Sequence, residues 1–118
     1  MAALLAWLGF AAHNVVEFSA RTFATLDTVA PTVVTVALVV WWWRRPSGGA
    51  AVVALLTWTT LNAFGGAITV LPVDVRPFQP AQTVSHYVMH GIYFGAQLPL
   101  MTLLIRRLRA RGQAPRST

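Results

Sequence analysis

The sequence predicts an all-α membrane protein, a bundle of four transmembrane helices with both ends of the chain in the cytoplasm. Of its 118 residues, 56% are hydrophobic and only 10% are charged, whereas an average soluble domain carries charge on about 25% of its residues. Four apolar runs have the length of about 17–25 residues that a helix needs to cross a bilayer. The basic residues are all arginines, and most of them lie beside these runs. These observations predict the class and its orientation.

The composition excludes several other classes. The chain has no cysteine, so it is not a disulfide-stabilised scaffold, and its apolar content is too high for a disordered protein. The net charge of +6 does not indicate nucleic-acid binding, because the arginines lie at the ends of apolar runs rather than on a soluble face. We therefore expect the lipid bilayer, with its anionic headgroups, as the partner, and no nucleic acid.

Each predicted span follows from an apolar run and the residues that bound it. No positive segment precedes the first run, so we expect a retained helix rather than a signal peptide. Asp27 or Thr28 is expected to cap the main part of the second span, with Pro31 in its first turn. The sequence RRPSGG predicts a tight turn between the second and third spans, and three prolines shape the loop at 72–83. The expected spans are about 2–18, 23–43, 50–71 and 84–105, which form one domain at 1–105, followed by a basic tail at 106–118 that frays into disorder.

The arginines predict the orientation. Seven of them lie in the turn at 44–49 and in the tail at 106–118, which four spans place on the same side of the membrane. Because cytoplasmic segments are enriched in Lys and Arg, both termini are expected in the cytoplasm, in a bacterial-type plasma membrane. The three tryptophans at 41–43 would then lie at the cytoplasmic headgroups, where indole rings are favoured.

Four ionisable residues interrupt the apolar runs. His13 and Glu17 in the first span, and His86 and His90 in the fourth, are each spaced i,i+4, which places each pair on one helical face. The two helices run in opposite directions, so if they are neighbours, Glu17 meets His86, and His13 meets His90 one turn deeper. The sequence therefore predicts a His/Glu cluster between the first and fourth helices, in the extracytoplasmic half of the membrane.

Three histidines and a carboxylate are typical ligands of a metal ion. Imidazole is the commonest metal ligand, and helical i,i+4 pairs inside a bundle direct two ligands at one point. We expect His13, Glu17, His86 and His90 to hold Zn²⁺, Cu²⁺ or Fe²⁺, or His13 and His90 to ligate the iron of haem b, with the outer pair and Arg76 near its propionates. A redox or metal-handling role would follow.

Further residues are expected to support the cluster. The candidates for hydrogen bonds to the ligands are Asn14, Tyr87, Tyr93 and Gln97. Gly91 and Gly95 form a GxxxG pattern on the face of the fourth helix opposite the histidines, which predicts close helix packing. Pro99 is expected to loosen the fourth helix without a further role.

Two other functions use the same residues. In size and helix count the chain resembles the small multidrug-resistance transporters, in which a glutamate on the first helix couples protons to cationic substrates; the resemblance implies that role for Glu17. The polar residues could instead join helices by hydrogen bonds in an accessory subunit of a membrane complex. With four short spans, we expect either a homo-oligomer or such a complex.

The sequence predicts no catalytic residues. Ser85 precedes His86, but neighbours along a helix point about 100° apart. No Ser–His–Asp arrangement can be read, so the sequence leaves enzymatic activity open.

Overall fold

The computed structural model describes residues 1–18, 20–71 and 82–113, and every element in this part of the chain is helical. The predicted all-α class is therefore confirmed. Three helices are long and apolar enough to cross a membrane, and the first is apolar but shorter. The elements are α1 (Ala2–Phe18), the 3₁₀ helix η1 (Ala20–Ala24), α2 (Leu26–Arg44), α3 (Gly49–Thr69) and α4 (Val84–Gly112).

The second helix begins later than the predicted span, because η1 occupies the residues just before it. Thr25 has extended backbone angles at the N-cap, and Val29 N–H bonds back to its carbonyl. With the helix starting at Leu26, Pro31 lies in the second turn rather than the first. The hydroxyl of Thr35 donates to the carbonyl of Pro31 at 2.8 Å.

Helix α4 continues well past the predicted end of its span. Its N-cap is Thr83, whose side chain accepts from His86 N–H, and it ends at Gly112 rather than near residue 105. The expectation of a frayed tail after 105 was wrong for this stretch, where Arg111 donates to the carbonyl of Pro46 at 2.5 Å. The rest of the tail, at 114–118, and most of the proline-rich loop, at 72–81, lie outside the described residues.

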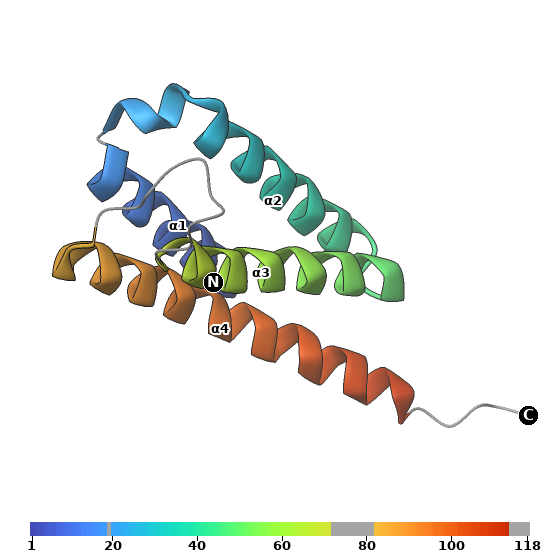
Figure 1. Ribbon diagram of the computed structural model, residues 1–118. Coiled ribbons are helices and arrows are strands. Elements are labelled where there is room, and N and C mark those ends of the chain that lie inside the picture. The colour runs from blue at the N-terminus through green and yellow to red at the C-terminus, as the bar shows by residue number, and fades with distance from the viewer. Residues whose placement is uncertain (19, 72–81, 114–118) are drawn as a thin grey trace, which may run out of the picture.

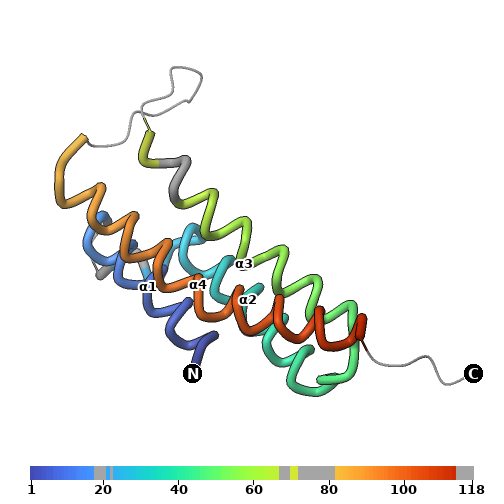
Figure 2. The backbone as a smooth tube through the Cα atoms, turned by 90° about the horizontal axis from the view of Figure 1, so that it is seen from below, coloured from blue at the N-terminus to red at the C-terminus, as the bar shows by residue number. Residues whose placement is uncertain are grey.

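Helix α4 is the centre of the bundle, since both α1 and α3 pack along it, while α2 contacts mainly α3 (Figure 1). Figure 2 shows the start of α1, the turn between α2 and α3, and the last turns of α4 toward one end of the molecule. We call this the arginine end. Near it lies the apolar core, formed by Ala6, Val52, Leu55, Leu100 and Leu104. The opposite half of the bundle holds the predicted polar cluster.

Candidate functional site: a histidine cluster between α1 and α4

The four ionisable residues come together where α1 and α4 pack against each other. The Nε2 atoms of His13 and His90 are 3.0 Å apart, and His86 Nδ1 lies 2.6 Å from a carboxylate oxygen of Glu17. The ring centroids of His86 and His90 are 4.5 Å apart. All three histidines are buried, with 5–9% of each residue exposed. The antiparallel crossing therefore pairs these residues at the two levels that the spacing predicts.

The ring orientation of His90 is fixed by a backbone carbonyl. Its Nδ1 contacts the carbonyl oxygen of Gly66 on α3. A carbonyl oxygen can only accept a hydrogen bond, so Nδ1 carries the proton. In the neutral ring, Nε2 then presents its lone pair toward His13.

The ring of His13 is held in the same way by a side chain. Its Nδ1 lies 3.0 Å from Asn14 Oδ1, and the amide nitrogen of Asn14 donates to the hydroxyl of Thr28 at 2.9 Å. With the amide in this orientation, Nδ1 of His13 donates and Nε2 carries a lone pair. Two nitrogen lone pairs therefore face each other across 3.0 Å, an arrangement that a shared cation stabilises.

His86 is arranged similarly but is held less firmly. Its Nδ1 is within ion-pair distance of Glu17, but neither nitrogen of this buried ring has a hydrogen-bond partner among the described residues. Thus each histidine of the cluster has Nδ1 against an oxygen and Nε2 without one. In metal-binding histidines the nitrogen that does not bind the metal donates to an oxygen acceptor, and His13 and His90 have this pattern.

Two of the other predicted polar residues lie on the buried face of α4, and one does not. Tyr93 is buried, with its ring centroid 5.6 Å from that of His13, and its hydroxyl donates to Asn62. Gln97, one turn further along α4, is also buried and donates to the carbonyl of Ala6 at 2.9 Å. The expectation for Tyr87 was wrong: it is 43% exposed and its hydroxyl donates to Gln82. Tyr87 follows His86 directly, so it points about 100° away from the histidine face.

The glycines in close helix contacts are not the predicted pair. A Cβ atom on Gly91 or Gly95 would meet nothing within 4 Å, so neither takes part in helix packing within the described chain. Instead, a Cβ on Gly9 would lie 2.4 Å from Cβ of Ala96, and one on Gly66 would lie 2.6 Å from the ring of Tyr93. Gly9 lies on the same face of α1 as His13, where small residues allow α4 to approach.

Sequence reasoning missed the partners that hold the rings. The carbonyl of Gly66 leaves no sequence signal, because every residue has a carbonyl group. Thr28 does leave a signal, since it is a polar residue near the start of an apolar run, but that position predicts only a helix cap. In the structure it is 2% exposed and supports Asn14.

The cluster as it stands is not a complete metal site. Among the described residues, no group of three or more His, Cys, Asp or Glu side chains is arranged to hold an ion. Haem ligation fits poorly, because metal–nitrogen bonds of about 2.0 Å require the two Nε2 atoms about 4 Å apart with the porphyrin between them. The imidazoles are instead in direct contact. Arg76, expected near the propionates, lies outside the described residues.

No family model, curated protein or solved structure matches the chain. The helices and their apolar surfaces are those of a small membrane protein.

Proposed function

We propose that the chain is a multi-pass plasma-membrane protein that binds a divalent transition-metal ion at the histidine cluster and serves in metal handling. In this proposal α1 spans the bilayer with the other three helices. The arginine end faces the cytoplasm and the cluster faces the extracytoplasmic side. A homo-oligomer, or assembly into a larger membrane complex, is compatible with the small size of the bundle.

The observation that carries the proposal is the shared orientation of the three imidazoles. Each has an oxygen next to Nδ1. This oxygen belongs to Gly66 for His90, to Asn14 for His13 and to Glu17 for His86. Each Nε2 is left with no oxygen partner. In a tetrahedral site with zinc–nitrogen bonds of 2.0–2.1 Å, two ligand nitrogens lie about 3.3 Å apart. The distance of 3.0 Å between His13 and His90 is close to that value.

The third ligand requires a side-chain rotation. Because the described residues hold no ready set of three ligands, His86 must turn its Nε2 toward the other two. Its unpartnered Nε2 loses no hydrogen bond in such a turn. Glu17 then acts as the carboxylate that orients His86, a smaller role than the direct ligation that the sequence suggests.

The test is the metal content of the full chain, purified in detergent without chelators and then titrated with Zn²⁺ or Co²⁺. We expect one ion per chain, and its loss in His13→Ala and in His90→Ala. Gln97→Leu is the matched control, since it removes an equally buried polar group from the same face of α4 and should leave the metal content unchanged. Metal-free wild-type protein that also fails to bind either ion would overturn the proposal.

A second candidate is favoured by the same contact. A proton shared by the two Nε2 atoms would also remove the repulsion between their lone pairs. The transporter interpretation requires such a proton-binding site. A proton path across the membrane would have to cross the interior between Gln97 and the arginine end. This part of the interior is apolar, and Leu55, Leu100 and Leu104 are fully buried there. Wild-type protein that binds no metal but takes up one proton per chain, with both histidines needed, would favour this candidate.

A further inference from the structure

A cavity lies at the arginine end, away from the histidines. It has a volume of about 300 Å³, at the lower limit of the roughly 300–1,000 Å³ typical of ligand pockets. Three helices contribute to it. Its wall is mostly apolar, and the residues that matter here are Ala3, Val39, Leu100 and Leu103, together with Trp42 and Arg107.

A buried hydrogen-bond donor without an acceptor lies in the wall of this cavity, and a second lies at the same end of the molecule. The guanidinium of Arg107 lies over the ring of Trp42, 5.1 Å from its centroid. Among the described residues, the buried indole Nε1 of Trp42 has no hydrogen-bond partner, and neither has Nη1 of Arg111, whose Nη2 donates to Pro46. Buried polar groups are nearly always hydrogen-bonded. Two such donors at one end of the molecule therefore indicate an acceptor beyond the described residues.

The charge at this end points to the same conclusion. Six arginines of the described chain lie here: Arg44, Arg45, Arg106, Arg107, Arg109 and Arg111. The sequence has only three acidic residues. Glu17 and Asp27 lie at the other end of the bundle, and Asp74 lies outside the described residues. The partner that neutralises this end must therefore be an anion.

We propose that the cavity binds one anionic phospholipid. Its acyl chain would lie along Ala3, Val39 and Leu103, and its phosphate would accept hydrogen bonds from Arg107 and from the indole N–H of Trp42. Guanidinium groups suit phosphate oxygens because they offer several donors in one plane. The apolar wall favours a lipid over a free phosphate ion, which would leave that wall unused. The inference is independent of the histidine cluster but rests on the proposed membrane orientation.

The experiment is native mass spectrometry of the full chain in neutral detergent, titrated separately with phosphatidylglycerol, phosphatidylcholine and soluble glycerol phosphate. We expect one bound phosphatidylglycerol per chain, and clearly weaker binding of the other two. Arg107→Ala should weaken phosphatidylglycerol binding about tenfold or more, the effect of losing a charged hydrogen bond. Arg109→Ala removes the same charge from the same helix outside the cavity, and should leave binding within about twofold.

Two further variants keep the test decisive if Arg107→Ala fails to fold. Trp42→Phe retains the aromatic ring but removes the N–H donor, and Arg107→Lys retains the charge but not the planar donors. Both should weaken phosphatidylglycerol binding. Equal losses for Arg107→Ala and Arg109→Ala would reduce the effect to diffuse charge attraction and overturn the proposal. Glycerol phosphate that binds as tightly as the lipid would also overturn it.

Discussion

Gly66 has two roles at the histidine cluster. Its carbonyl accepts the hydrogen bond from His90, and its lack of a side chain leaves room for the ring of Tyr93. Gly9 allows a similar close approach between α1 and α4, because a Cβ there would collide with Ala96. A methyl group at Gly9 would force α1 and α4 apart, whereas one at Gly66 would force the buried ring of Tyr93 to shift.

We therefore expect Gly9→Ala and Gly66→Ala to destabilise the bundle by about 1–3 kcal/mol each, the usual cost of an overpacked contact. Gly91→Ala and Gly95→Ala are the matched controls, since their Cβ atoms meet nothing within 4 Å. Both should be neutral or slightly stabilising, because alanine is the better helix former. Denaturant unfolding in detergent micelles measures the difference. Equal effects at all four positions would contradict this account of how α1 and α3 pack against α4.

At the residue scale, helical periodicity predicts from the sequence which side chains share one face of a helix. The i,i+4 spacing identified both His/Glu pairs, and the same periodicity would have removed Tyr87 from the cluster. It cannot identify which carbonyl or amide holds each ring, because those contacts depend on how α1, α3 and α4 cross. The contact between His90 and Gly66 is set by tertiary structure and leaves no trace in either local sequence.

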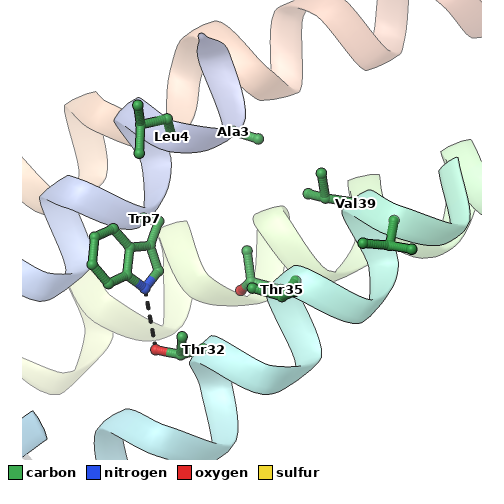
Figure 3. Close-up of a pocket in the computed structure, with 8 residues that line it drawn as sticks. Ala3, Leu4, Trp7, Thr32, Thr35 and Val39 are labelled. Carbon is green, nitrogen blue, oxygen red and sulfur yellow. Dashed lines mark hydrogen bonds between the residues drawn. The ribbon is translucent and has the colours of Figure 1, made fainter. Parts of the chain in front are cut away.

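Of the four α-helices, α2 is the least buried. Thr28 is its one fully buried residue, and a cavity of about 380 Å³ separates α2 from α1. Two indole groups connect α2 to its neighbours: Trp7 donates to Thr32 at 3.1 Å and Trp58 donates to Thr35 at 2.9 Å. Figure 3 shows Trp7 directed across the cavity toward Thr32. These hydrogen bonds lie on an otherwise apolar surface.

Replacing both Trp7 and Trp58 with Phe should loosen α2 while the α1–α4 contact persists, because only the indole donors to α2 are lost. Interhelical hydrogen bonds in membranes contribute about 0.6 kcal/mol each on average, enough together to broaden a distribution of distances. The chain has no cysteine, so spin labels can be attached at chosen positions. Electron paramagnetic resonance should show a broader distance distribution between labels at Leu5 and Val36. A label pair at Leu5 and Leu98 should be unchanged, and broadening of both pairs would mean general unfolding.

The four helices were predictable because their apolar runs are long and well bounded, but their ends were less so. At about 1.5 Å per residue, the 29 residues of α4 extend about 44 Å, beyond a hydrocarbon core of about 30 Å. Hydropathy detects only the apolar part of such a helix. The last two turns are held by helical hydrogen bonds and by the contact of Arg111 with Pro46, which hydropathy does not detect.

The whole molecule separates its two kinds of polar chemistry by the apolar core. Six of the seven described arginines gather at one end, and the histidines and Glu17 lie toward the other, with the core between them. The even number of predicted spans and the arginine positions make this separation predictable from the sequence. The sequence could not predict that α1 and α4 are neighbours, because four helices can be arranged around a bundle in more than one order.

The orientation can be tested with single cysteines at exposed positions. We expect Ser47→Cys, in the turn between α2 and α3, to react with a membrane-impermeant thiol reagent only after the cytoplasmic side is opened. Thr25→Cys, just before α2, should react in intact cells, because it lies at the other end of that helix. The reverse pattern would place the histidine cluster on the cytoplasmic side and contradict the proposed topology.

The connection between His13 and His90 also has a consequence for biosynthesis. The two residues are 77 positions apart in the chain, on the first and the last helix. When α1 enters the membrane, the helix that shields its histidine and glutamate has not yet been made. Until α4 arrives, these side chains must be covered by lipid headgroups, by the insertion machinery or by another protein. A chain that stops before α4 would keep an unshielded polar face in the bilayer, which quality-control proteases could recognise.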